Sequence, residues 1–264
     1  MLRCTKPNTR IIVTLESEAE LAPKLADGSY SQITLPRDEA HHVKNVLRLK
    51  EGAFLEIISR DSHKKYEAVL QTLEPEVQVR ILRLSSSTSS ISKVNPLIFA
   101  LCKGDTNEWV LEKACELAVS SIVIFQAEHS VVKLKSAEDA EKKLVRWNKI
   151  CDAASKQSGN PNIPQIFFCK NLNEALLKAD ALGSSEQLKV CCSLSENTID
   201  LNTLPTEPRN ISLIIGPEGD LSKKEEESLK QQEYKFATLG PYTLRAETAA
   251  ISAVSAINAI FGYN

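Results

Sequence analysis

The stretch SLIIGPEGDLSKKEEE, from Ser212 to Glu227, joins the end of an apolar strand to the start of a charged helix. The apolar run 211–215 stops at Gly216-Pro217-Glu218-Gly219, and Ser222 with Glu225 three residues later forms a capping-box pattern. Ligands of open α/β sheets bind outside the carboxyl ends of strands, where glycines let the backbone approach closely. The turn matches neither the dinucleotide fingerprint nor the P-loop, so alone it indicates only a tight turn.

A second strand end carries a similar loop. The segment LGPYTLRAET, which begins at Leu239, also starts with Gly-Pro after an apolar run. It places Arg245 and Glu247 two residues apart, and a helix rich in small residues follows at once over residues 246–261. Two such loops at the ends of strands predict one shared cleft.

The second half of the chain alternates short apolar runs with helical patterns, which is typical of a parallel sheet with helices on both faces. The sequence predicts α/β structure with strands at 97–101, 122–125, 165–168, 188–192, 211–215 and 236–239, and helices at 109–119, 136–156 and 246–261. The residues 105–108 predict a helix start with Glu108 three residues after an Asp105 cap.

The first half has a different pattern. Short alternating runs at 11–13, 32–35, 53–59, 65–70 and 77–82 predict a small barrel or sandwich, and a helix is expected over residues 38–48, with Val43, Val46 and Leu47 packed inward. The serine-rich stretch 85–95 has the composition of a flexible linker, and we expect the domain boundary there.

Composition excludes several classes of protein. The net charge of −2 does not fit a polycation, so any nucleic acid must be bound through a local patch. Seven cysteines without a C-x-x-C pair predict reduced, buried thiols rather than a disulfide framework or a zinc site, and His41 and His42 have no third ligand nearby. No run approaches the ~18 apolar residues of a membrane span. We therefore expect an unprocessed cytoplasmic protein with no membrane partner.

Four blocks together resemble one known family. LIIGPEGDLSKKE, LGPYTLRAETAA, CKGDTNEWVLEKACELAV and AASKQSGNPNIPQI are similar to signature blocks of the RsmE family, and AHHVKNVLRLKEG at 40–52 resembles its N-terminal RNA-binding domain. Members use S-adenosylmethionine to methylate N3 of a uridine in 16S ribosomal RNA. The resemblance implies a PUA-like β-barrel over 1–88, a SPOUT methyltransferase domain over 89–264 with a trefoil knot at roughly 190–264, and a homodimer acting on the small ribosomal subunit, not on DNA.

The resemblance also implies roles for residues. The cofactor would be held by Gly216, Glu218, Gly219, Leu239, Gly240 and Leu244. Uridine N3 carries a proton and is a poor nucleophile until the proton leaves, so a base or a cation that stabilises the uracil anion is needed. Arg245 and Glu247 are the candidates for catalysis. The alternative is an Arg–Glu pair that only braces the start of the last helix.

RNA contact is expected in the first half of the chain. Lys44 and Arg48 are four residues apart, so they would share one face of the predicted helix, near His42. Such a face suits phosphate, although an ordinary solvated helix is the commoner explanation. Arg10 matches an arginine of the family's first strand and is expected to reach the target loop. Lys156 is the candidate to take over the phosphate contact of the arginine that Asn160 replaces.

The sequence departs from the family pattern at four positions. Asp220 stands in place of a usual glycine and Ala246 in place of threonine, while Asn160 replaces arginine and Lys156 stands where glutamate is common. Two alternatives stay open. One, within the same fold, is a methyltransferase for another RNA position such as a ribose 2′-hydroxyl. The other is an RNA-binding assembly factor without catalysis, for which Asn160 and Ala246 leave room. A nucleotide-dependent oxidoreductase ranks last because its glycine fingerprint is missing.

Overall fold

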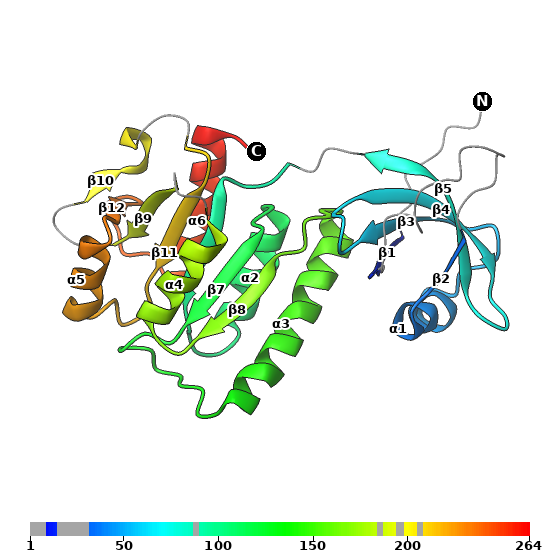
Figure 1. The fold of residues 1–264 in the computed structure, drawn as a ribbon, viewed down its shortest axis with the longest axis horizontal. Coiled ribbons are helices and arrows are strands. Elements are labelled where there is room, and N and C mark those ends of the chain that lie inside the picture. The colour runs from blue at the N-terminus through cyan, green and yellow to red at the C-terminus, as the bar shows by residue number, and fades with distance from the viewer. Residues whose placement is uncertain (1–8, 15–31, 87–89, 184–186, 194–197, 205–207) are drawn as a thin grey trace. The chain divides into compact units, whose positions relative to one another are not determined.

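The chain forms two compact units, each with its own core (Figure 1). The computed structural model describes residues 9–14, 32–86, 90–183, 187–193, 198–204 and 208–264. The first unit comprises residues 1–89 with 155–163, and the second comprises 90–154 with 164–264. The predicted boundary between residues 88 and 89 lies outside the described residues.

The first unit is built on one curled five-stranded sheet (Figure 1). Its core forms because alternate strand residues, such as Leu55 and Ile57, point to the same face and are fully buried there. β1 pairs in parallel with β3, and the other pairs are antiparallel. In sheet order the strands are β1 (Arg10–Val13), β3 (Phe54–Ser59), β4 (Lys65–Thr72), β5 (Gln78–Ser86) and β2 (Gln32–Thr34).

The continuous helix predicted over residues 38–48 is wrong. A short α1 (Arg37–His41) passes into a π-helical turn, η2 (His42–Val46), in which Leu47 N donates to His42 O at 2.9 Å. Val43 is fully buried, whereas Val46 is 60% exposed and Leu47 is exposed as well. The wider i→i+5 turn rotates the later residues away from the face that an α-helix would give them. Arg48 has φ +51°, so Lys44 and Arg48 do not share the predicted helix face.

The second unit is a seven-stranded sheet in which every pair is parallel. Two of its inner strands, Ser121–Phe125 and Ile211–Ile215, are mostly apolar and are buried at every position because both faces of the sheet are covered. The order is β10 (Ile199–Asp200), β12 (Lys235–Thr238), β9 (Leu188–Cys192), β11 (Ile211–Ile215), β6 (Val94–Ala100), β7 (Ser121–Phe125) and β8 (Gln165–Cys169). A short 3₁₀ turn, η3 (Leu201–Thr203), follows β10.

Helices cover both faces of this sheet (Figure 1). α4 (Leu172–Leu182) and α5 (Lys223–Gln231) bury apolar residues in one cluster with Ile98, Phe125 and Ile214. α2 (Thr106–Glu116) and α6 (Ala246–Phe261) pack together against the other face. α3 (Ala137–Ser158) packs on α2, where Cys151 Sγ lies 3.8 Å from Leu111 O. The predicted parallel α/β arrangement is confirmed.

Helix starts were predicted with mixed success. The capping box of Ser222 and Glu225 is present at α5. At α2, by contrast, the Asp105 side chain makes no capping hydrogen bond to any described residue, and Glu108 instead binds Arg146 at 2.7 Å. α4 was not predicted, although Asn171 Oδ1 accepts from Glu174 N at 2.9 Å and this spacing is a recognisable cap.

The described cysteines are thiols, and most of them are buried. Cys102, Cys115, Cys151, Cys169 and Cys191 are buried, and Cys192 is partly buried. Cys4 lies outside the described residues. Within the described parts of the chain, no helix has the length and apolar character needed to cross a membrane.

Candidate active site

A cavity of about 590 Å³ opens at the carboxyl ends of the neighbouring strands β12, β9 and β11. All of its lining residues belong to the second unit. The loop after β11 contributes Gly216, Pro217, Glu218 and Asp220, and the loop after β12 contributes Leu239, Gly240 and residues 242–247. The two Gly-Pro loops therefore share one cleft, as their positions after strands predicted.

The first of these loops is shaped by a tight turn. Asp220 N donates to Pro217 O at 3.0 Å, and Asp220 has the left-handed φ of +61°. Aspartate tolerates this conformation better than most residues, and its Oδ1 accepts from Leu221 N at 2.9 Å. The aspartate thus keeps the turn that the family pattern gives to glycine.

The second loop contributes the backbone of a glycine and the side chains of two leucines to the cavity lining. Gly240 N donates to Thr238 Oγ1 at 3.2 Å, and a Cβ added to Gly240, whose φ is +134°, would meet no atom within 4 Å. The backbone at Gly240 is therefore open to a ligand. Leu239 and Leu244 are partly buried and form an apolar part of the lining.

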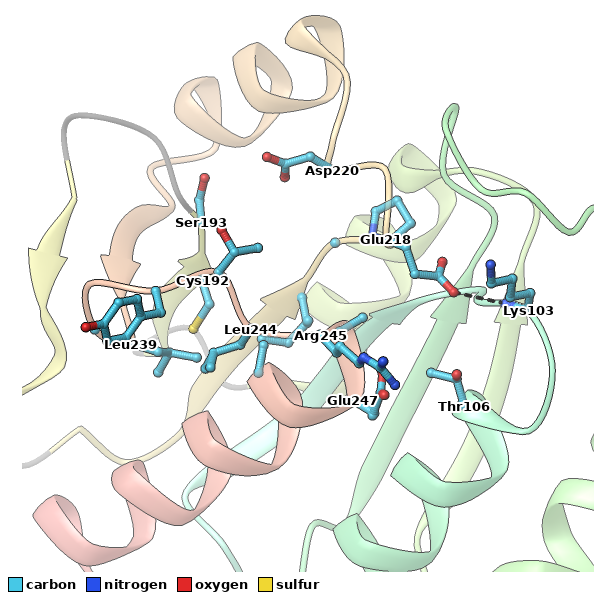
Figure 2. A pocket seen from close by; sticks show the side chains of 18 residues that line it. Lys103, Thr106, Cys192, Ser193, Glu218, Asp220, Leu239, Leu244, Arg245 and Glu247 are labelled. Atoms are coloured by element: carbon cyan, nitrogen blue, oxygen red, sulfur yellow. Dashed lines mark hydrogen bonds between the residues drawn. The ribbon is translucent and has the colours of Figure 1, made fainter.

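Charged residues gather at another part of the cavity. In Figure 2, Lys103, Glu218, Arg245 and Glu247 lie on one side of the view, and Cys192, Leu239 and Leu244 lie on the other. Lys103 N donates to Glu218 Oε1 at 3.4 Å, which ties the loop after β6 to the loop after β11. The pKa of the Cys102 thiol is raised, chiefly by burial and then by the charges of Glu218 and Glu247. The charges of both carboxylates therefore act on the same thiol.

Arg245 and Glu247 stand at the start of α6. Arg245 occupies the N-cap position and is exposed, while Glu247 is half-buried in the first turn. Both line the cavity (Figure 2), and the structure shows no salt bridge or side-chain hydrogen bond between either of them and any described residue. The alternative of a bracing Arg–Glu pair is therefore not realised among these residues.

Most, but not all, of the predicted pocket residues come together. Gly216, Glu218, Leu239, Gly240, Leu244, Arg245 and Glu247 line the cavity. Gly219 does not belong to the lining, and a Cβ placed on it would lie 3.3 Å from His129 Cβ. The prediction missed Cys192 at the end of β9, Ser193 directly after it, and Lys103 and Thr106 beyond the end of β6. Each lies at or shortly after the end of a predicted strand, but the sequence does not say which strand ends are neighbours.

The residues predicted to contact RNA lie in the first unit, where several are already engaged. Arg10 binds Glu56 Oε2 at 3.0 Å and donates to the carbonyls of Lys156 and Gln157 at 2.8 Å each. Lys156 forms a salt bridge with Glu39.

The other predicted RNA-contacting side chains differ in their salt bridges and in their exposure to solvent. Lys44 forms a salt bridge with Glu74, whereas His42 is half-buried and Arg48 is exposed. Asn160, where the family pattern has arginine, shapes a turn in which its Oδ1 accepts from Asn162 N at 3.0 Å. RNA contact by Arg10, His42, Lys44, Arg48 and Lys156 stays a prediction.

Two domain families match the chain. A profile described as an RNA methyltransferase domain matches residues 92–258, which is more than half of the chain, and one described as an RNA methyltransferase PUA domain matches residues 35–82. These matches confirm the predicted methyltransferase domain and PUA-like domain.

Full-length relatives agree with these matches. The chain is 29% identical to ribosomal RNA small subunit methyltransferase E of Bacillus subtilis over 84% of its own length and 87% of the relative. The protein of the same name from Mesomycoplasma hyopneumoniae is 31% identical over 66% of this chain and 77% of the relative. A crystal structure of ribosomal RNA small subunit methyltransferase E from Neisseria gonorrhoeae bound to S-adenosyl methionine has a TM-score of 0.79 and 26% identity, covering 96% and 98% of the two chains. The chain belongs to the ribosomal RNA small subunit methyltransferase E family.

Proposed function

We propose that this protein is a ribosomal RNA methyltransferase that uses S-adenosylmethionine to methylate N3 of a uridine in 16S ribosomal RNA. The observation that carries the proposal is the cavity at the ends of β12, β9 and β11, whose lining combines open backbone, leucines and two acidic side chains at one charged side. Relatives named for methylation of small-subunit ribosomal RNA, and a similar structure bound to S-adenosyl methionine, support it.

The residues present fit this cofactor. The cavity of about 590 Å³ lies within the roughly 300–1,000 Å³ of small-molecule sites. Leu239 and Leu244 would enclose the adenine, and backbone groups of the loops at Gly216 and Gly240 would accept and donate hydrogen bonds. The carboxylates of Glu218 and Glu247 favour a positively charged sulfonium over a neutral ligand. When bound, S-adenosylmethionine supplies an electrophilic methyl group.

The protein's own contribution is positioning and charge. Methyl transfer needs the acceptor nitrogen held in line with the methyl group and close to it, which is mostly a task of orientation. Arg245 is exposed at the cavity and its guanidinium has no ion-pair partner among the described residues, so it is available to stabilise the uracil anion. Glu247, two residues on, is the candidate to accept the N3 proton.

Recognition of RNA is assigned to the first unit. The match to a PUA domain over residues 35–82 supports this role, and the net charge of −2 requires a local patch rather than a general affinity for polyanions. Arg48, exposed at the end of the π-helical turn, is the least constrained of the predicted cations. Selective binding to a folded ribosomal particle is therefore expected, with little affinity for unstructured RNA or DNA.

Three further features belong to the proposal: a homodimer, a cytoplasmic location and a trefoil knot over roughly residues 190–264. The dimer is supported by exposed apolar side chains at the C-terminal end, Ile260 at 45% and Tyr263 at 47%. The knot is proposed from the family resemblance, and the three loops that line the cavity, after β9, β11 and β12, all fall in that segment. Light scattering tests the dimer directly.

The decisive experiment incubates undermethylated small subunits with the protein and labelled cofactor, followed by mass spectrometry of the nucleosides. Label in 3-methyluridine supports the proposal. Label in a 2′-O-methylated nucleoside would identify a methyltransferase for another position. Binding of subunits without any label transfer, and without heat on titration with S-adenosylmethionine, would identify an assembly factor. Naked RNA of the same sequence serves as the comparison for selectivity.

A further inference from the structure

The charged side of the cavity contains a second cation besides Arg245. Lys103 follows β6 and lines the same cavity, and these two are the cations among its lining residues. The facing carboxylates are Glu218 and Glu247, with Thr106 supplying a hydroxyl nearby (Figure 2). A cavity that bound only a neutral or cationic ligand would gain nothing from the positive charges of Lys103 and Arg245. Their presence indicates that an anionic group also binds there.

The backbone at Lys103 is anchored on both sides. Cys102 N donates to Asn107 Oδ1 at 3.0 Å, and the buried Asn107 also donates to Ala100 O at 3.4 Å. Lys103 N donates to Glu218 Oε1 at 3.4 Å. Glu218 thus uses one carboxylate oxygen to hold the main chain of Lys103. The loop is fixed while the lysine side chain remains exposed.

The Lys103 ammonium itself is available. No salt bridge joins it to any residue that the structure describes, whereas Lys44, Lys113 and Lys156 each have a carboxylate partner. A lysine held at a cavity by its backbone, with its charge left uncompensated by a direct contact, is suited to an anionic group of a ligand.

We infer that Lys103 is a further catalytic residue, whose ammonium binds a carbonyl oxygen of the target uracil and stabilises the anion formed when N3 loses its proton. The inference rests on the proposed function. The N3 proton passes to a carboxylate, for which Glu247 is the candidate. The N3 lone pair then forms the new N–C bond while the C–S bond breaks and its electron pair stays on sulfur. Lys103 and Arg245 together hold the negative charge on uracil until the methyl group arrives.

A competing role for Lys103 is contact with an RNA phosphate, and kinetics separate the two. Stabilisation of the uracil anion acts in the transition state, so its loss lowers kcat with little change in KM. Loss of a phosphate contact raises KM for the subunit and lowers the salt dependence of binding by about one counterion. The exposed position of Lys103 favours intact folding of its variants.

The test compares Lys103→Met with Lys103→Arg and with Lys149→Met, an exposed lysine on α3 that does not line the cavity. Undermethylated small subunits are prepared with uridine or with 5-fluorouridine, whose N3 proton is more acidic. Single-turnover formation of the 3-methyl nucleoside is measured, and cofactor affinity is measured by calorimetry. We expect Lys103→Met to react about 100-fold more slowly on uridine, in the range found for loss of one electrostatic donor. On 5-fluorouridine the deficit should shrink by roughly tenfold, because less stabilisation of the anion is needed.

Cofactor affinity should be unchanged in Lys103→Met, Lys103→Arg should keep most of the activity, and Lys149→Met should behave as wild type. An equal deficit on both nucleosides, a change confined to KM, or an unaffected Lys103→Met would overturn the inference while the wild type remains active. A wild type that forms no 3-methyluridine would overturn the proposed function itself, and with it this role of Lys103.

Discussion

Ser222 and Glu225 cap each other at the start of α5. Glu225 N donates to Ser222 Oγ at 3.2 Å, and Ser222 N donates to Glu225 Oε2 at 2.9 Å. The other carboxylate oxygen of Glu225 accepts from Glu128 N at 3.1 Å, in the loop after β7. One buried glutamate therefore fixes the start of the helix that follows the first cavity loop and also holds the loop after β7.

Glu225→Ala should destabilise the second unit by about 2–4 kcal/mol, because the buried N–H group of Ser222 and the partly buried N–H group of Glu128 both lose a charged acceptor. Glu227→Ala, an exposed substitution in the same helix, should change stability by less than about 0.5 kcal/mol. Urea unfolding followed by tryptophan fluorescence is a suitable measurement, because Trp109 and Trp147 both lie in the second unit. Equal effects of the two variants would contradict the importance of the capping box.

Arg245→Ala should keep the fold and cofactor binding but lose methylation, because its guanidinium is exposed at the cavity and braces nothing among the described residues. A rate loss of about 100-fold is expected for one electrostatic donor. Circular dichroism and calorimetry check fold and cofactor affinity, and the subunit assay checks turnover. Arg146→Ala, which removes a surface salt bridge to Glu108, is the control. Wild-type turnover in Arg245→Ala would remove this residue from the mechanism.

Gly159→Ala should lower the free energy of unfolding of the first unit more than Gly52→Ala does. Both glycines have left-handed φ angles, +77° and +83°, so each substitution costs about 1–2 kcal/mol from the backbone alone. A Cβ on Gly159 would also lie 2.9 Å from Arg10 Cζ, whereas a Cβ on Gly52 would meet nothing within 4 Å. Hydrogen–deuterium exchange in β3 and β4 measures the difference. In a double-mutant cycle, Arg10→Ala should partly relieve Gly159→Ala, and strict additivity would argue against the clash.

Stability should fall in alkaline solution partly because of Cys115. Burial, with added repulsion from Asp152 and Glu116, raises the pKa of this thiol from 9.0 to about 12. The unfolded chain therefore loses the proton at lower pH than the folded protein, and the free energy of unfolding decreases as pH rises from about 9 to about 12. The contribution approaches about 1.4 kcal/mol per pH unit. Below pH 9 it is fully retained.

Comparison of wild type with Cys115→Ala isolates this thiol from other groups that titrate in the same range. The variant should lose stability less steeply above pH 9, with a constant offset below that pH from the lost sulfur atom. Denaturant midpoints measured at several pH values give both slopes. Parallel slopes for the two proteins would show that Cys115 does not titrate differently in the folded and unfolded states.

Local patterns predicted some elements well and others poorly, for physical reasons. The last helix begins at Ala246 and ends at Phe261, as expected, because apolar and small residues make up most of this segment and Gly262 follows it directly. The helix over residues 38–48 failed because its spacing of apolar residues fits an α-helix, whereas the chain makes i→i+5 hydrogen bonds there and buries only Val43 of the three expected residues.

The contacts of Arg10 could not be predicted from the sequence. Its position near the first strand was matched to an RNA contact, but nothing in the sequence places it beside the carbonyls of residues 156 and 157, nearly 150 positions later. Three hydrogen bonds engage its guanidinium in the first unit. The role of a long cation depends on such distant partners, and periodicity carries no information about them.

The sequence by itself determined the parallel α/β pattern and the two Gly-Pro loops, because buried strands, caps and turns depend on residues close together in the chain. Only the tertiary structure decided that β9 lies between β12 and β11 and that β6 lies next to β11. This order brings Cys192, Ser193, Lys103 and Thr106 to the same cavity as Arg245 and Glu247. Strand order is set by hydrogen bonds and packing between segments far apart in sequence, and so the full composition of the site follows from the folded chain alone.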